Sequence, residues 1–200
     1  MEERAVTSAD YAAVAPRCDP GIQRAAATLR WTGSWHTVFL TVDRLGGAPV
    51  DTEYKDGLRR CLDRYRMAGR DLEIDMPRFV PLEVEAFVCV QPGYYQTEVR
   101  TALQEVLSNR LLPNGRRGLF HPDNFSFGQA VYLSPIYAAA QAVPGVASLE
   151  IMKFRRQGIA ATEAGDLGRL DMSRLEIAGL DNDPDFRERG VLTLTLRGGR

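Results

Sequence analysis

The sequence is poor in the two residue types on which most zinc and thiol sites depend. It holds three cysteines and two histidines, with no CxxC pair and no two histidines at helical spacing. A structural zinc site therefore has little support, because such sites gather four ligands at short spacings. Cys18, Cys61 and Cys89 are odd in number and widely spaced, and Cys61 and Cys89 lie within apolar patterns, which predicts that these two are buried thiols in a reducing compartment.

Long apolar runs and an excess of one charge sign are also missing. No run approaches the roughly 18 apolar residues of a membrane span, and MEERAVTSADY has no apolar core, so neither a transmembrane helix nor a signal peptide is expected. The 25 basic and 26 acidic residues argue against binding nucleic acid or membranes through bulk charge. Arg59, Arg60, Arg64 and Arg66 cluster, but interleaved acids predict a solvated helix face there.

Motifs of the common nucleotide, hydrolase and calcium sites are absent or incomplete. There is no GxxxxGK[ST] loop, no GxGxxG after a strand, no HExxH and no GxSxG. The segment DNDPDFRERGVL places Asp181, Asp183 and Asp185 at ligand positions of a calcium loop. Phe186 stands where that loop requires glycine and Leu192 where it requires glutamate, which favours an acidic turn.

One polar loop, HPDNFSFG at 121–128, does contain the residue types of a hydrolytic site. His121, Asp123 and Ser126 are close in sequence, but residues of one short loop rarely converge as a catalytic triad. Pro122 and the Asp-Asn pair are typical of turns. We interpret the loop as a turn, so no catalytic, cofactor-binding or metal residue is predicted. A hydrolase using His121 with a nearby acid, and a mixed His/Asp metal site, are the alternatives.

Hydrophobic periodicity predicts alternating helices and strands. Apolar residues recur at helical spacing near residues 8–15, 52–68, 96–108 and from 134 onward. They alternate as in strands at 36–43, 82–90, 146–154 and 191–196, with shorter strands expected at 72–76, 127–132 and 174–177. The alanine-rich residues 22–31 fit either state, a TGS link at 32–34 fits a hairpin, and 157–168 resembles a surface loop.

This order of elements predicts an α+β fold with mixed sheets and helices packed mainly on one face. Two ferredoxin-like sublobes fit the pattern, as an N-terminal lobe at 1–79 and a C-terminal lobe at 80–200. Interfaces favour Trp, Tyr and Arg anchors. By residue type alone, the interface candidates are Trp31, Trp35, Arg78, Tyr94 and Tyr95, although each of them could equally belong to the core.

Five ordered stretches of the chain resemble one protein family. They are RAVTSADY (4–11), IQRAAATLRWTGSWHTVFLTVDRLGG (22–47), RYRMAGRDLEIDMPRFVPLEVEAFVCVQPGYY (64–95), GLFHPDNFSFGQAVYLSPIYAAAQAVPGVASLE (118–150) and GRLDMSRLEIAGLDNDPDF (168–186). Together they are similar to the baseplate assembly proteins, the baseplate J-like wedge subunits of contractile phage tails and contractile injection systems. The resemblance covers nearly the whole chain and is to the C-terminal portion of the longer family members.

The resemblance implies a structural role in baseplate assembly, without enzymatic activity, catalytic residues or cofactors. Such subunits assemble as sixfold-repeated wedges around the tail hub. The expected partners are other wedge subunits, including a second copy of this chain and a related wedge protein, with sheath-initiating and hub proteins nearby. Neither nucleic acid nor membrane insertion is expected, and the phage tail-like particle would assemble in the cytoplasm. A small-molecule-binding ferredoxin-like module is a further alternative, resting on fold analogy.

Overall fold

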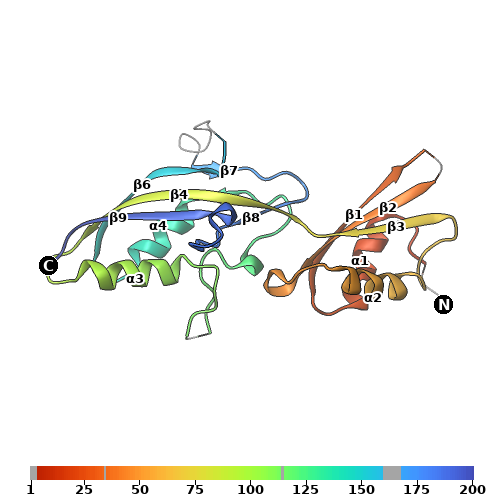
Figure 1. The fold of residues 1–200 in the computed structure, drawn as a ribbon, viewed down its shortest axis with the longest axis horizontal. Coiled ribbons are helices and arrows are strands. Elements are labelled where there is room, and N and C mark those ends of the chain that lie inside the picture. The colour runs from red at the N-terminus through yellow and green to blue at the C-terminus, as the bar shows by residue number, and fades with distance from the viewer. Residues whose placement is uncertain (1–3, 34, 114, 160–167) are drawn as a thin grey trace. The chain divides into compact units, whose positions relative to one another are not determined.

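The computed structural model describes residues 4–33, 35–113, 115–159 and 168–200. The chain divides into two compact units, unit 1 at Met1–Arg78 and unit 2 at Phe79–Arg200, and each is described by itself (Figure 1). Helices and mixed sheets occur in both, so the predicted α+β class is confirmed. Most of the predicted loop at 157–168, and the last residue of the TGS link, lie outside the described residues.

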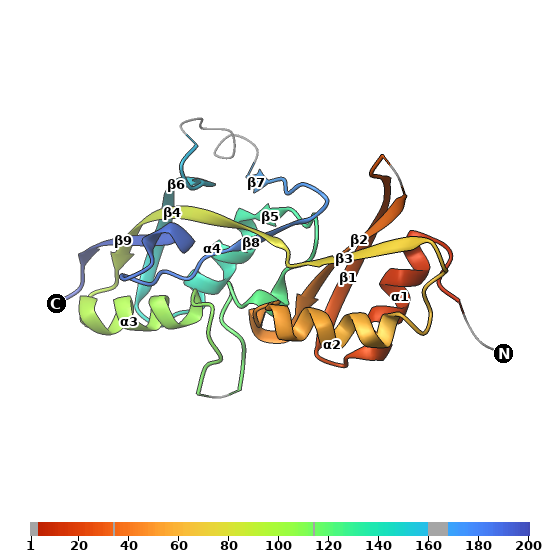
Figure 2. The same cartoon turned by 45° about the vertical axis from the view of Figure 1, so that its right-hand side comes forward.

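Unit 1 is a three-stranded sheet whose two helices lie on the same side (Figure 2). Antiparallel β1 and β2 form a hairpin, and β3 joins β2 in parallel, which gives the order β1-β2-β3. In chain order the elements are α1 (Ser8–Cys18), β1 (Ile22–Trp31), β2 (His36–Arg44), a short 3-10 helix (Leu45–Gly47), α2 (Thr52–Leu62) and β3 (Arg70–Asp75).

The core of unit 1 lies between the sheet and its helices. Val38, Leu40 and Val42 are fully buried on the helix side of β2, as their alternation predicts. Tyr11 of α1 and Leu62 of α2 cover them and are equally buried. Alternate residues of the strands therefore point to the opposite side, which we call the outer face of unit 1.

The ends of the helices in unit 1 follow partly from local sequence. Thr7 and Asp10 cap α1 reciprocally: the Asp10 amide donates to the Thr7 hydroxyl at 3.2 Å, and the Thr7 amide donates to the Asp10 carboxylate at 2.8 Å. In contrast, α2 ends at Leu62 and not near residue 68 as predicted. Beyond it the chain turns, and Arg66 forms an isolated bridge with Ala5, a tertiary contact that helical periodicity does not report.

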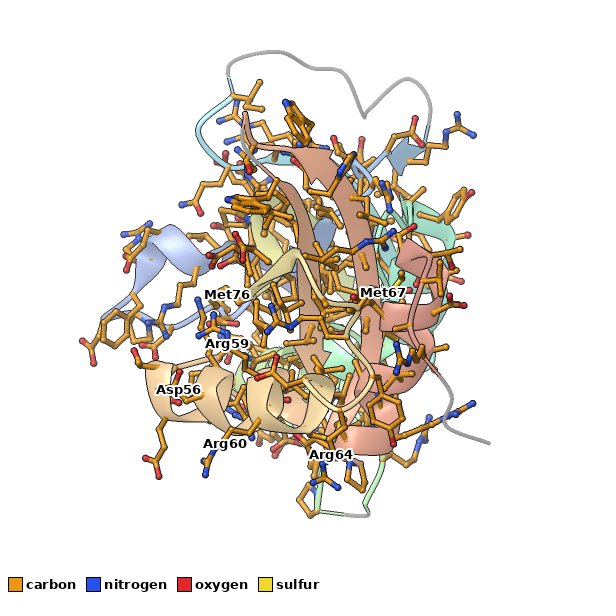
Figure 3. All side chains as sticks on the ribbon, turned by 90° about the vertical axis from the view of Figure 1, so that its right-hand side faces the viewer. Asp56, Arg59, Arg60, Arg64, Met67 and Met76 are labelled. Carbon is orange, nitrogen blue, oxygen red and sulfur yellow. A yellow bond between two sulfur atoms is a disulfide. The ribbon has the colours of Figure 1, made fainter. Side chains whose placement is uncertain are left out.

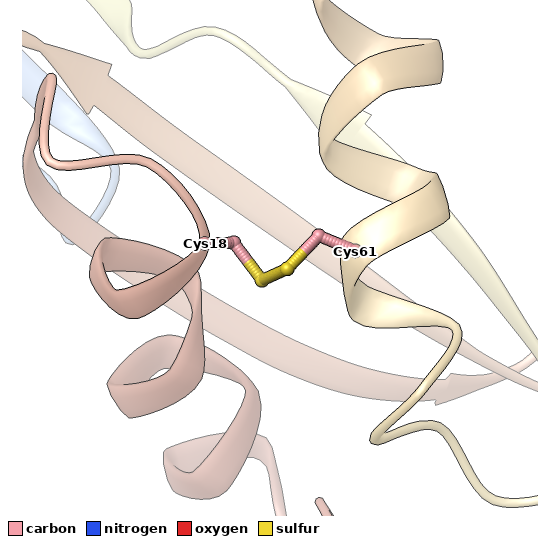
Figure 4. The surroundings of a disulfide bond; sticks show 2 residues. All are labelled: Cys18 and Cys61. Atoms are coloured by element: carbon pink, nitrogen blue, oxygen red, sulfur yellow. A yellow bond between two sulfur atoms is a disulfide. The ribbon is translucent and has the colours of Figure 1, made fainter.

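The cysteines correct one prediction. Cys18 at the end of α1 and Cys61 in α2 form a disulfide, with their Cα atoms 5.9 Å apart (Figure 4). Cys61 is therefore not a free thiol, and Cys89 is free but only partly buried. The pairing depends on α1 and α2 packing side by side on one sheet, which their spacing of 43 residues does not reveal. With this pairing, the cysteines no longer indicate a reducing compartment.

Unit 2 is built around one long central strand. β4 pairs with antiparallel β6 on one side and with parallel β9 on the other, and it also neighbours β8, while β5 and β7 form a separate small sheet. In chain order the elements are β4 (Arg78–Val90), α3 (Gln96–Val106), a 3-10 helix (Pro122–Asn124), β5 (Val131–Tyr132), α4 (Leu133–Gln141), β6 (Val146–Arg156), β7 (Arg169–Leu170), β8 (Glu176–Gly179), a 3-10 helix (Arg187–Arg189) and β9 (Val191–Gly198).

The core of unit 2 occupies the helix side of this sheet. Leu82, Val84 and Val88 alternate along β4 and are almost completely buried. Leu103 of α3 and Ile136 of α4 belong to the same buried cluster. The opposite side of the sheet, which we call the outer face of unit 2, carries the odd-numbered residues of β4.

An ion pair with a buried carboxylate joins β6 to the start of β8. The Arg156 guanidinium lies 2.8 Å from the Glu176 carboxylate, and Glu176 is only 5% exposed. The same carboxylate accepts the Ser173 amide at 2.8 Å. Burial by itself would raise the pKa of Glu176, but the hydrogen bonds from Ser173 and Arg156 outweigh it, so the pKa lies below its usual range.

Candidate interaction surfaces

Two exposed tryptophans lie at the end of the β1–β2 hairpin. Trp31 exposes 61% of its surface and Trp35 exposes 58%. Thr32 closes the hairpin, since its amide and its hydroxyl both donate to the Trp35 carbonyl, at 3.0 and 3.1 Å. The His36 ring meets the Trp31 ring edge-on, with centroids 5.1 Å apart. Large exposed aromatic side chains are typical anchors of protein interfaces.

The adjacent tyrosines between β4 and α3 are exposed to different extents. Tyr95 is 50% exposed, and its carbonyl accepts the Val99 amide as α3 begins. Tyr94 is 39% exposed, and one side of its ring packs over Gly145. A Cβ built on Gly145 would stand 2.7 Å from that ring, so Tyr94 serves local packing as well as the surface.

The five interface candidates are therefore on the surface and not in the core. Arg78 is also exposed, at the start of β4. The structure brings Trp31 and Trp35 together at one turn, and Tyr94 and Tyr95 together at another. Whether a partner contacts them stays a prediction.

Residues 121–124 adopt the geometry of a turn. The His121 Nδ1 accepts the Asp123 amide at 3.2 Å, and the Asp123 carboxylate lies 3.0 Å from the Arg117 guanidinium. Asn124 donates to the Gly118 carbonyl at 2.8 Å. In a catalytic triad the imidazole donates from Nδ1 to the acid and accepts a proton at Nε2. Here Nδ1 is the acceptor, so the arrangement supports the turn and gives the hydrolase hypothesis no support.

The acidic loop also bonds within the protein. Asn182 Oδ1 accepts the Leu192 amide at 2.9 Å, and Asp183 Oδ1 accepts the Asp185 amide at 2.9 Å. Calcium loops instead converge six or more oxygens on one ion. Among the described residues, no three His, Cys, Asp or Glu side chains are grouped to hold a metal ion.

A cavity of about 390 Å³ opens between the end of α3 and the acidic loop, and sequence reasoning missed it. It is lined by segments more than seventy residues apart, which are bridged where Asn109 donates to Asp181 at 2.9 Å. Thr101, Gln104 and Leu192 also line it.

The outer face of unit 2 carries cross-strand ion pairs. Lys153 on β6 lies 3.1 Å from both Glu83 and Glu85 on β4, and Arg155 lies 2.6 Å from Glu83. The hydrogen bond from Arg155, together with Lys153, lowers the pKa of Glu83 against partial burial. The hydrogen bonds that Lys153 donates to Glu85 and Glu83 raise the pKa of Lys153. Pairs of this kind join neighbouring strands, and the strand register shifts at a bulge directly after Glu85, which the sequence pattern does not show.

The arginine cluster forms a solvated helix surface only in part, because α2 ends at Leu62 and Arg64 and Arg66 lie beyond the helix. Figure 3 shows Asp56, Arg59 and Arg60 along the exposed side of α2, and Arg64 beyond the end of the helix. Arg59 lies 3.5 Å from the Asp56 carboxylate, and Arg60 donates to the Asp56 carbonyl at 3.3 Å. Acidic groups thus offset the positive charge locally.

Two comparisons with known proteins, by family model and by solved structure, gave a match to a baseplate protein. The family model of the Baseplate J-like central domain matches residues 3–75, which nearly coincide with unit 1. A chain in the cryo-EM structure of the anti-feeding prophage (AFP) baseplate, 6-fold symmetrised, has a similar fold, with a TM-score of 0.54 and 16% sequence identity. The match covers 89% of this chain and 38% of that chain, so this chain spans well under half of its length. A comparison with curated proteins found no match.

Proposed function

We propose that this chain, whose residues 3–75 match the family model of the Baseplate J-like central domain, is a structural wedge subunit of a contractile phage tail or contractile injection system. The family match over unit 1 is the observation that carries the proposal. The likeness in fold to a baseplate chain supports it, because that likeness extends over both units.

Features of the surface are consistent with such a role. An assembly subunit requires anchors that keep their position while neighbours bind, because ordering mobile side chains reduces affinity. The tryptophans of the hairpin project from a sheet that carries two helices, and the Cys18–Cys61 disulfide links those helices. No helix among the described residues is long and apolar enough to span a membrane.

The proposed partners are other wedge subunits. They include a second copy of this chain and a related wedge protein, with sheath-initiating and hub proteins nearby and assembly in the cytoplasm. Contacts of this kind are protein–protein interfaces, for which exposed Trp and Tyr side chains are suitable. Neither a cofactor nor a nucleic acid takes part in the proposal.

Cryo-EM of native particles, compared with particles from a strain that lacks the gene, tests this role. The expected result is density for both units, repeated six times in the collar around the tail hub, and loss of the assembled baseplate in the deletion strain. Mass spectrometry of purified particles provides an independent check. Absence of the chain from the particles, or its presence only in fibres or sheath, would contradict the proposal.

A further inference from the structure

In unit 1, arginine side chains occupy outward backbone carbonyls of the edge strand β3. Arg59 donates to the Leu72 carbonyl at 3.3 Å, and Arg66 donates to the Arg70 carbonyl at 2.5 Å. Backbone groups of alternate residues in a strand point to the same edge. An added strand would therefore have to displace both guanidinium groups, which protects this edge.

The edge strand β9 in unit 2 is closed in the same way. Arg100 on α3 donates to the Leu194 carbonyl at 2.9 Å. Gln96 at the start of α3 donates to the Gly198 carbonyl at 2.6 Å. Side chains of one helix thus occupy outward acceptors near the middle and the end of β9.

Some backbone groups of β6 and β8, the other two neighbours of β4, are also occupied by hydrogen bonds. On β6, the Ile151 amide donates to the Tyr137 hydroxyl at 3.2 Å, and the adjacent Met152 lies at a bulge in the pairing. On β8, the Glu176 carbonyl accepts the Gly128 amide at 2.9 Å. Bulges and covering loops are common protections of sheet edges.

The outer half of β1 differs from these edges. The Thr32 amide bonds to the Trp35 carbonyl, and hydrogen-bonded pairs alternate along an antiparallel hairpin. Even-numbered residues of β1 such as Arg30 therefore bond to β2, and the backbone groups of Leu29 and Trp31 point outward. In the part of the chain that the structure describes, no hydrogen bond occupies those outward groups of Leu29 and Trp31.

The side chains beside this edge define what could bind there. On the helix side, half-buried Leu29 and exposed Trp31 present apolar surface. On the outer face, Arg30 is exposed, with its guanidinium 5.4 Å from the centre of the Phe39 ring. Successive side chains of a strand added next to β1 would therefore lie alternately in an apolar and in a positively charged environment.

We propose that residues 28–31 of β1 bind an extended segment of another protein as an added antiparallel strand. The segment has an apolar–acidic–apolar pattern: its apolar side chains lie opposite Leu29 and Trp31, and its acid lies opposite Arg30. Backbone hydrogen bonds supply affinity and the alternate side chains supply selectivity, as in other cases of strand addition.

Charge argues for a different protein as the partner, and against a second copy of β1. The outer face of β1 carries Arg24 and Arg30, and the strand IQRAAATLRW contains no acid. Pairing two copies of β1 would bring like charges together, which is unfavourable across strands. The inference does not depend on the proposed baseplate role, because it concerns an edge of the isolated chain.

The test uses the intact, oxidised chain and a blocked peptide, Thr-Val-Thr-Val-Glu-Val-Thr, with hydrogen exchange followed residue by residue by NMR. Binding should slow exchange of the Leu29 and Trp31 amides by about tenfold or more at saturating peptide. The Thr28 and Arg30 amides, already bonded to β2, should change little. A peptide with Lys in place of Glu should bind at least about tenfold more weakly.

Charge reversal provides matched variants. Arg30→Glu should reverse the preference between the Glu and Lys peptides. Arg24→Glu, on the same face of the same strand, should retain it. Protection centred on other residues, equal binding of both peptides, no binding at millimolar peptide, or peptide-independent dimerisation through β1 would each overturn the proposal. None of these outcomes bears on whether the chain occurs in the baseplate.

Discussion

Reduction of the Cys18–Cys61 disulfide should destabilise unit 1 and leave unit 2 nearly unchanged. The bond connects α1 to α2 across a separation of 43 residues. In the chain-entropy model a cross-link of that length removes about 13 cal/mol/K from the unfolded ensemble, or about 4 kcal/mol at 25 °C. For a unit of 78 residues, that loss lowers the melting temperature by roughly 15–30 °C.

Calorimetry of the full chain, with and without reductant, measures the size of the effect. Hydrogen exchange with mass spectrometry assigns it, because peptides from residues 4–75 and from 79–200 report on the two units separately. The double variant Cys18→Ser with Cys61→Ser should reproduce the reduced protein. Cys89→Ser is the matched control, since Cys89 is a free thiol in unit 2.

Two results would refute the reasoning. A loss of unfolding free energy in unit 1 smaller than about 1 kcal/mol would contradict the entropy argument. It would mean that residual structure keeps the reduced, unfolded chain nearly as compact as the disulfide does. An equal loss in both units would mean that the disulfide does not act on unit 1 alone.

Three further predictions concern individual side chains. Because the pKa of Glu176 is lowered, its contribution to the stability of unit 2 is present above the unfolded pKa and is lost as pH falls through the folded value. Urea titrations should show that Glu176→Gln costs about 2 kcal/mol at pH 7 and flattens this acid dependence. Gly145→Ala should destabilise unit 2 by about 1–3 kcal/mol, because its Cβ would meet an aromatic ring 2.7 Å away, whereas Gly158→Ala, also at positive φ but in open space, should cost less. Replacing Trp31 and Trp35 together by Ala should leave thermal unfolding almost unchanged yet reduce incorporation into particles, as immunoblots would quantify; normal incorporation would remove these side chains from the interface.

The alternation of apolar residues in the sequence was sufficient to predict a strand where one face of that strand is buried. Val38, Leu40 and Val42 alternate because one face of β2 is buried, and the same logic predicts residues 82–90 of β4, which in the structure begins earlier, at Arg78. The N-termini of α1 and α2 were also predictable, since Thr7 and Asp51 cap their helices through contacts three residues away.

Ambiguities arose where local preference is weak and a tertiary contact decides. The alanines of residues 22–31 favour neither state, and pairing with β2 along the whole segment makes it a strand. The surface candidates were chosen by residue type, so Leu111 and Met152, which are 65% and 62% exposed, were missed. Exposure of an apolar residue depends on what packs around it, which residue type alone does not report.

The sequence by itself determined the α+β class, most helices and strands, and the turn at His121, because each depends on residues within a few positions of one another. Only the tertiary structure decided the partner of Cys18, the end of α2, the ion pairs around Glu83 and, among the described residues, the open outward backbone groups of Leu29 and Trp31 on β1. These features join residues far apart in the chain, and their geometry exists only after the sheets and helices have packed. The same reason explains why the candidate interaction surfaces became visible only on the folded chain.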